Sequence, residues 1–165
     1  MGSPVTTDRS VLEGIDRSRI VAVVYHLLGS REAAEDITSD AVVALLEHDG
    51  EIRDVSTWLR TVAYRRALNE LRRRRREDAA VVRLSDPTPE ADWATALHDH
   101  AQVAEAVAQL PDQQRTAALL HWGDDLPLSD VAKIMGCAAA TVRVHLFRAR
   151  RRLRTTLDGN TTLDG

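Results

Sequence analysis

Apolar side chains recur at helical spacing along almost the whole chain, and this spacing limits the fold more than any other feature. Steps of one, three and four residues join Ile20, Val23, Val24 and Leu27, and similar series continue through most of the sequence. Such spacing puts the apolar residues on one face of a helix. Aromatic residues make up only 4% of the chain, so its cores must be built from Ala, Val, Leu and Ile. The pattern predicts an all-α protein.

The helical pattern is interrupted in the middle of the chain. Residues 86–90 contain two prolines and cannot continue a helix, because proline lacks a backbone donor and restricts the residue before it. We therefore expect two small helical domains, residues 12–77 and 100–157, joined by a flexible acidic linker over residues 78–99. In the first domain, Ser56 is the expected N-cap of the third helix. The duplicated pentapeptide after Arg154 is expected to fray.

Arginines are concentrated in two stretches of the sequence. Arg60 to Arg76 holds eight of them and Arg143 to Arg154 holds six, against one acid, Glu70. The formal net charge of −3 therefore conceals two cationic segments on an acidic remainder. Two cationic helices suit a polyanion held at two places, because each arginine near a phosphate releases a condensed counterion. For the run at residues 72–76 alone, a solvated helix end is the alternative interpretation.

The segment from Leu128 to Phe147 has the form of a helix-turn-helix, with Gly136 supplying a positive φ at the turn. The expected inward positions are Val131, Ala132, Met135, Val142 and Leu146. The expected outward positions are Thr141, Arg143, Val144, His145, Phe147 and Arg148. Arg143 has the chemistry to read guanine edges, while Val144 and Phe147 can contact a thymine methyl group. The alternative is a helical hairpin with a merely solvated charged face.

Other kinds of chemistry find little support in the sequence. The single cysteine, Cys137, excludes an intrachain disulfide and a cysteine-cluster metal site. Among the six histidines only His98 and His100 lie close together, and no nucleophile–base pair or glycine-rich phosphate loop is present. No apolar run is long enough to span a bilayer. We expect no enzymatic activity, cofactor or metal site, no membrane insertion, and a cytoplasmic location.

Three segments, in this order and spacing, together resemble a small bacterial sigma factor of the extracytoplasmic-function type, which has only sigma regions two and four. Ala34 to Leu46 is similar to the family's polymerase-binding helix. Ser56 to Arg73 is similar to the helix that reads and melts the minus-ten element. Leu110 to Arg115, followed by Leu128 to Arg150, resembles region four, which reads the minus-thirty-five element. The loop from His48 to Val55 departs from the family in lacking an aromatic residue.

The resemblance implies promoter DNA and core RNA polymerase, through its β′ coiled coil and β flap, as partners. It implies that the polymerase-binding residues are Asp36, Ser39, Asp40 and Val43. The implied minus-ten residues are Thr57, Trp58, Arg60, Arg65, Arg66, Asn69, Arg72 and Arg73. The implied minus-thirty-five residues are Thr141, Arg143, Val144, His145, Phe147, Arg148, Arg150 and Arg151.

The sequence is also compatible with two alternative functions. One is a helix-turn-helix regulator that acts without polymerase, although such proteins usually bring a dimerisation surface. The other is a sigma-like module whose main partner is an anti-sigma protein. Co-purification with core polymerase separates these alternatives from a working sigma factor.

Overall fold

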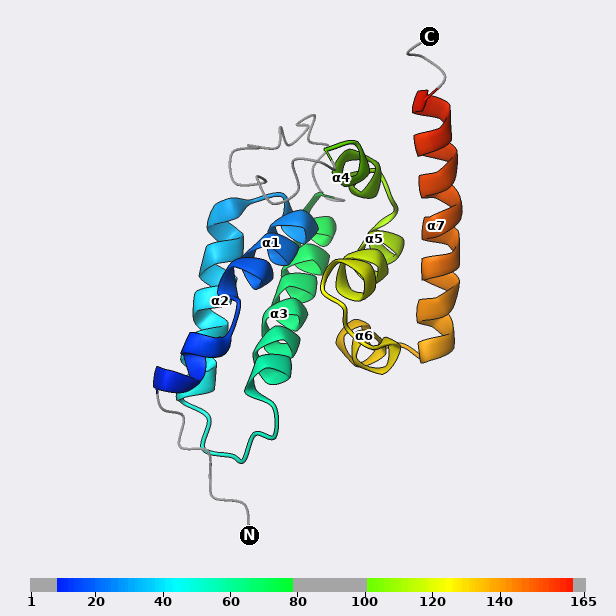
Figure 1. Cartoon of the computed structure of the whole chain (residues 1–165). Coiled ribbons are helices and arrows are strands. Elements are labelled where there is room, and N and C mark those ends of the chain that lie inside the picture. The colour runs from blue at the N-terminus through cyan, green and yellow to red at the C-terminus, as the bar shows by residue number, and fades with distance from the viewer. Residues whose placement is uncertain (1–8, 79–100, 162–165) are drawn as a thin grey trace. The chain divides into compact units, whose positions relative to one another are not determined.

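The computed structural model describes residues 9–78 and 101–161 (Figure 1). Within these two ranges the chain is helical nearly throughout and has no strand, which confirms the all-α prediction. The chain divides into two compact units, residues 1–83 and 84–165. Beyond Asp78, the predicted acidic linker lies outside the described residues, as do His98 and His100.

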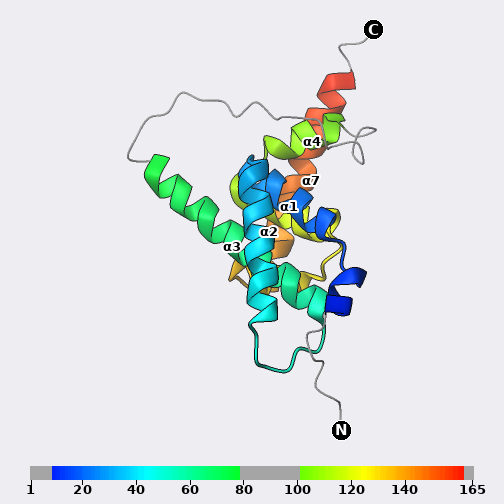
Figure 2. The ribbon, with the colours of Figure 1, turned by 90° about the vertical axis from the view of Figure 1, so that its left-hand side faces the viewer.

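The first unit is a bundle of three α-helices. A 3-10 turn (Arg9–Gly14) precedes α1 (Arg17–Leu28), α2 (Arg31–Leu46) and α3 (Val55–Asp78), and each of the three helices packs on the other two. Figure 2 shows that the C-terminal turns of α3 extend past α1 and α2. The long helix therefore has one half in the bundle and one half that projects from it.

The helix ends of the first unit are set by local hydrogen bonds. Asp16 Oδ1 accepts from the backbone N–H of Arg19 at 3.1 Å and begins α1. Gly29 ends α1 with a φ of 69°, and Ser30 caps α2. The cap of α3 is Asp54, whose Oδ1 accepts from the Thr57 N–H at 3.1 Å, so the prediction of Ser56 as N-cap is wrong. A carboxylate two residues earlier can reach the free N–H groups of the first turn.

The core of the first unit combines large and very small side chains. Leu45, Leu59 and Tyr64 are completely buried. Fully buried alanines on α2 and α3, including Ala41 and Ala63, allow the helix backbones to approach closely. The apolar spacing of Ala41, Val42, Leu45 and Leu46 predicts that all four face inward. Leu46 is instead 51% exposed, because it lies at the last position of α2 where no neighbour covers it.

Between residues 101 and 161, the second unit contains four α-helices and a π-helical turn. They are α4 (Ala101–Ala108), α5 (Asp112–Ala118), the π turn (Leu119–Gly123), α6 (Leu128–Met135) and α7 (Ala139–Thr161). α4, α5 and α6 all pack against α7 (Figure 1). The five residues predicted to face inward in the helix-turn-helix are all buried, which confirms that part of the prediction.

The turn between α6 and α7 depends on a glycine. Gly136 has a φ of 69°, and its N–H and that of Cys137 both donate to the carbonyl of Ala132. This left-handed end directs the chain from α6 into α7. α7 then continues to Thr161, so the expected fraying after Arg154 is wrong for residues 155–161. In the described ranges, no helix is both long and apolar enough to cross a membrane.

Replacement of Gly136 by alanine tests this turn. We expect Gly136→Ala to destabilise the second unit by about 1–2 kcal/mol, because an L-residue is strained at positive φ. An added Cβ would meet no atom within 4 Å at Gly136 or at Gly159, so steric clash is excluded at both sites. The control Gly159→Ala, inside α7, should be neutral or stabilising by up to about 1 kcal/mol. Hydrogen exchange of α6 and α7 amides measures both effects; equal stability of the two variants would contradict the proposed role of the turn.

Candidate nucleic-acid and partner interfaces

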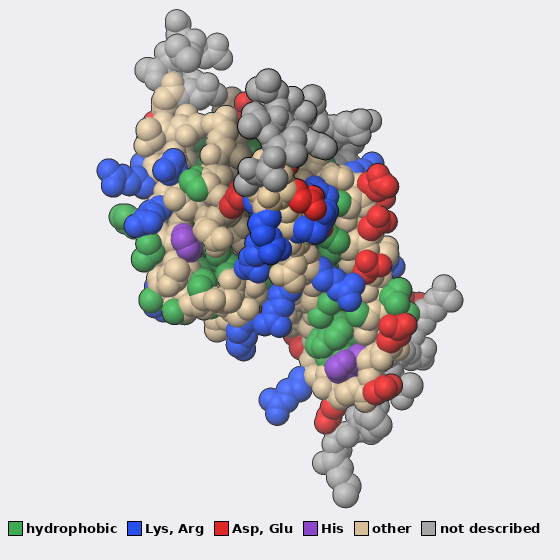
Figure 3. Space-filling model, turned by 180° about the vertical axis from the view of Figure 1, so that it is seen from behind, with side chains coloured by type: hydrophobic (Ala, Val, Ile, Leu, Met, Phe, Trp, Pro, Cys, Tyr) green, Lys and Arg blue, Asp and Glu red, His purple; other side chains and the backbone are tan. Residues whose placement is uncertain are grey.

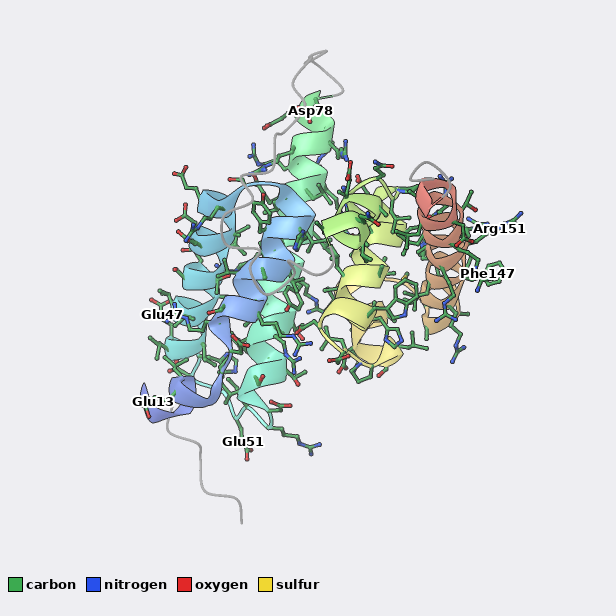
Figure 4. All side chains as sticks on the ribbon, turned by 45° about the horizontal axis from the view of Figure 1, so that its top comes forward. Glu13, Glu47, Glu51, Asp78, Phe147 and Arg151 are labelled. Atoms are coloured by element: carbon green, nitrogen blue, oxygen red, sulfur yellow. The ribbon has the colours of Figure 1, made fainter. Side chains whose placement is uncertain are left out.

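The face of α7 opposite its core carries most of the predicted minus-thirty-five residues. Val142, Leu146 and Ala149 are buried against the other helices of the unit. The exposed residues of the predicted set are Thr141, Arg143, Val144, Phe147, Arg148, Arg150 and Arg151, while His145 is partly buried. Phe147 is 69% exposed, and Figure 4 shows Phe147 and Arg151 pointing away from the rest of the unit. A large apolar side chain held in solvent by a rigid helix indicates a binding surface.

The arginines of α7 lie on the surface of the helix. None of its six arginines forms an ion pair with an Asp or Glu in the part of the chain that the structure describes. All six, from Arg143 to Arg154, are exposed. The helix therefore presents a cationic surface that also carries the two apolar side chains of Val144 and Phe147. This combination of charge and apolar contact suits a nucleic-acid groove.

The structure also places an aromatic ring beside this surface. Trp122, in the π turn, is 36% exposed, and the guanidinium carbon of Arg150 lies 5.5 Å from the centre of its ring. The two residues are 28 positions apart in the sequence, as their numbers show. Only the packing of the π turn beside α7 brings them together, so no local signal could have revealed the contact.

The arginines of α3 differ from those of α7 because acids on the same helix engage several of them. Glu70 accepts from Arg73 at 2.8 Å and from Arg74 at 2.7 Å, and Glu77 also pairs with Arg73. The hydrogen bonds from Arg73 and Arg74 lower the pKa of Glu70 to about 2. Arg74 additionally donates to the carbonyl oxygen of Leu28 at 3.2 Å. Part of this arginine run therefore stabilises the helix and its junction with α1.

One stripe of α3 is exposed to solvent along several turns. Arg65, Asn69 and Arg72 are exposed and follow one another at steps of four and three residues, with Trp58 seven residues before Arg65. This spacing places the four side chains on one face. Arg60 is five residues from Arg65, about 140° around the helix. It is partly buried, and its Nε donates to the carbonyl of Ser56 at 3.4 Å. The structure thus separates Arg60 from the stripe of Arg65, Asn69 and Arg72.

The loop between α2 and α3 carries a ring contact. The His48 imidazole lies 5.2 Å from the Trp58 ring, centre to centre, with the planes tilted by 49°. At the end of the loop, the Thr57 hydroxyl donates to Asp54 at 2.6 Å, and this bond is the main cause of the lowered pKa of Asp54. The His48 and Trp58 rings therefore lie side by side where the loop meets the first turn of α3.

The outward stripe of α2 is acidic and partly apolar. Asp36, Ser39, Asp40 and Val43, the four predicted polymerase-binding residues, are all exposed, and Leu46 extends the same stripe. Acidic side chains gather on this side of α2 in Figure 3. Asp40 also lies 3.9 Å from Arg66 of α3. In the described ranges, no three His, Cys, Asp or Glu residues are placed to hold a metal ion.

Comparisons with known proteins match each of the two parts of the chain to a family model. Residues 16–77 match the family model described as Sigma-70 region 2, and residues 100–153 match Sigma-70, region 4. The chain is 30% identical over 155 residues to the RNA polymerase sigma-H factor of Pseudomonas aeruginosa, covering 84% of this chain and 80% of that protein. The chain belongs to the sigma-70 family of RNA polymerase sigma factors, in its extracytoplasmic-function (ECF) group.

Further relatives support the same assignment. The chain is 33% identical over 145 residues to the ECF RNA polymerase sigma factor SigJ of Mycobacterium tuberculosis, covering 82% of this chain and 46% of that protein. A crystal structure of that SigJ matches with a TM-score of 0.63 at 25% identity, over 88% of this chain and 53% of the other. This chain therefore spans about half the length of SigJ. The sigma factor RpoE of Bartonella quintana, solved with the anti-sigma factor NepR, has the same fold, with a TM-score of 0.68 at 24% identity over 86% of this chain and 91% of that chain.

Proposed function

We propose that this chain binds core RNA polymerase and directs it to promoters by reading two DNA elements. Residues 12–77 act as sigma region two, and residues 100–157 act as sigma region four, with the connecting residues 78–99 as a linker along the polymerase. The observation that carries the proposal is the exposed face of α7, where six arginines without acidic partners in the described ranges flank Val144 and Phe147. The role is that of an initiation factor in the cytoplasm, without catalysis or a cofactor.

In region four, the exposed face of α7 enters the major groove of the minus-thirty-five element. Arg143 contacts base edges, Val144 and Phe147 contact thymine methyl groups, and the later arginines of α7 contact phosphates. The buried residues Val142 and Leu146 hold the helix on the rest of its unit, so that the reading face has one orientation. This assignment rests on the exposure of the face and on its charge.

In region two, α3 and the preceding loop hold the separated strand of the minus-ten element. Unstacked bases bind on rings and in pockets while arginines hold the phosphates, and this preferential binding of the open strand drives melting without ATP. Arg65, Asn69 and Arg72 form the exposed stripe that supports this role. The acidic stripe of α2, with Val43 and Leu46, docks on the β′ coiled coil, and region four meets the β flap.

A reconstituted initiation assay tests the proposal. Core RNA polymerase is mixed with this chain and a duplex template, and transcripts are mapped after the complex has been isolated by gel filtration. Co-elution with core and transcripts from a defined start site are expected. DNA binding without co-elution would instead indicate a helix-turn-helix regulator. Co-elution without defined start sites would point to a sigma-like module whose main partner is another protein, such as the anti-sigma factor seen with RpoE.

The exposed stripe of α3 makes a prediction about promoter opening. We expect Arg65→Ala with Arg72→Ala to leave polymerase binding intact and to reduce transcription from duplex promoters about tenfold or more, because two contacts to the open strand are lost. A template with a pre-melted minus-ten bubble should restore much of the activity, since the unpairing cost of a few kcal/mol has been removed.

Two controls make this experiment specific. Arg17→Ala with Arg31→Ala removes the same charge from exposed positions on α1 and α2 and should leave transcription unchanged. Arg60→Ala, on another side of α3, measures the contribution of the partly buried arginine. Equal impairment on duplex and pre-melted templates would assign Arg65 and Arg72 to general DNA affinity, and the residues that open the promoter would then lie elsewhere.

A further inference from the structure

Trp122 and Arg150 form a contact that core packing does not explain. The guanidinium carbon of Arg150 lies 5.5 Å from the centre of the Trp122 ring. The ring is 36% exposed, in contrast to Leu120 two residues earlier, which is completely buried. Arg150 is itself exposed and has no acidic partner in the described part of the chain. The indole ring is therefore the neighbour that orients this guanidinium.

The position of the indole is fixed by hydrogen bonds around it. The backbone N–H of Leu126 donates to the carbonyl of Leu120 at 3.1 Å, and the His121 Nδ1 lies 2.7 Å from the carbonyl oxygen of Leu126. These contacts join residues before and after Trp122, so the end of the π turn and the residues up to Leu126 form a compact loop. The backbone of Trp122 is thus constrained on both sides, and the ring contacts Arg150 of α7.

The chemistry of the contact suits phosphate binding. A guanidinium held against an aromatic face keeps the N–H groups at its edge free to donate in the plane, and a phosphate can accept two of them. Arg150 lies seven residues after Arg143, so the two side chains project from the same side of α7 two turns apart. A helix that contacts bases through Arg143 would bring Arg150 near the sugar–phosphate backbone.

We propose that Trp122 is a positioning residue for DNA binding, and that it holds Arg150 in the conformation that grips a phosphate beside the minus-thirty-five element. The indole restricts the many rotamers of the arginine before DNA arrives, so less conformational freedom is lost on binding. The proposal rests on the proposed function, because it requires that α7 binds duplex DNA. It adds a residue outside the helix-turn-helix to the DNA-binding surface.

A double-mutant cycle on the full chain tests the contact, with a short duplex carrying the minus-thirty-five element as the probe. Trp122→Leu should weaken binding about two- to fivefold, the range of an exposed cation–π contact. Arg150→Ala should weaken it further and lower the log–log salt slope by about 1. The double variant should bind no more weakly than Arg150→Ala alone. Trp122→Phe, which keeps an aromatic face, should restore most of the affinity lost in Trp122→Leu.

Arg152 provides the matched control on the same helix. Its exposed side chain projects about 160° away from that of Arg150 around α7, so the losses from Trp122→Leu and Arg152→Ala should multiply. A loss from Trp122→Leu that persists undiminished in the Arg150→Ala background would overturn the proposal and show a general structural role. Failure of Trp122→Phe to restore binding, while its melting temperature equals that of the wild type, would also overturn it. If the wild-type chain bound no duplex at all, the proposed function itself would fail first.

Discussion

The affinity of this chain for a duplex carrying only the minus-thirty-five element is expected to fall about a thousandfold between 50 and 200 mM salt. The exposed arginines of α7 allow roughly five or six phosphate contacts, and each neutralised phosphate contributes about −0.9 to the log–log slope, which gives a slope near −5. All six arginines are exposed, so the phosphates of DNA can reach them. Fluorescence anisotropy at four or five salt concentrations measures the slope.

Two variants separate base reading from phosphate contact within the same helix. Arg143→Ala should cost about 1–3 kcal/mol on the preferred sequence and much less on other sequences, as expected for a lost base contact. Arg152→Ala should weaken binding to all sequences about equally and lower the salt slope by about 1. If Arg143→Ala also weakened binding uniformly, Arg143 would be a phosphate contact and the base-reading residues would have to be sought elsewhere on α7.

The second large effect is expected at the acidic stripe of α2. Asp36→Arg with Asp40→Arg should weaken binding to core polymerase about a hundredfold or more, because like charges placed across an interface cost several kcal/mol. The two side chains lie one turn apart on the same exposed face, whereas Ala41 and Leu45 hold the helix in the bundle. The substitutions should therefore leave the first unit folded. Gel filtration with core polymerase and a binding titration measure the effect.

Two controls address the other consequences of these substitutions. Asp40 lies 3.9 Å from Arg66, so Arg66→Gln, which keeps the carboxylate of Asp40, shows what the loss of that ion pair alone contributes. Such an exposed pair is worth at most about 1 kcal/mol, and little change in polymerase binding is expected. Glu13→Arg with Glu105→Arg changes the net charge equally at exposed positions outside α2 and should not affect binding. Unchanged co-elution of the α2 variant would contradict the assignment of this stripe.

Much of the fold could be predicted because it follows from local patterns. The spacing of Val131, Met135 and Val142, together with one glycine between them, indicated the helix-turn-helix, and all three are buried. The same periodicity indicated three helices in the first unit. It failed at helix ends: Asp54 rather than Ser56 caps α3, and Leu46 is exposed. At the end of a helix, the path of the adjoining chain decides which residue caps the helix and which side chain is covered. The apolar repeat of three to four residues does not specify that path.

The sequence by itself determined which residues share a helix face and where positive charge is concentrated, because both depend only on spacing along the chain. The tertiary structure decided which of those charges remain available. Arg73 and Arg74 are engaged by Glu70, and Arg74 also reaches the carbonyl of Leu28, whereas Arg150 lies against Trp122. Contacts between residues far apart in the sequence exist only after the helices have packed, since packing alone fixes the distance between them.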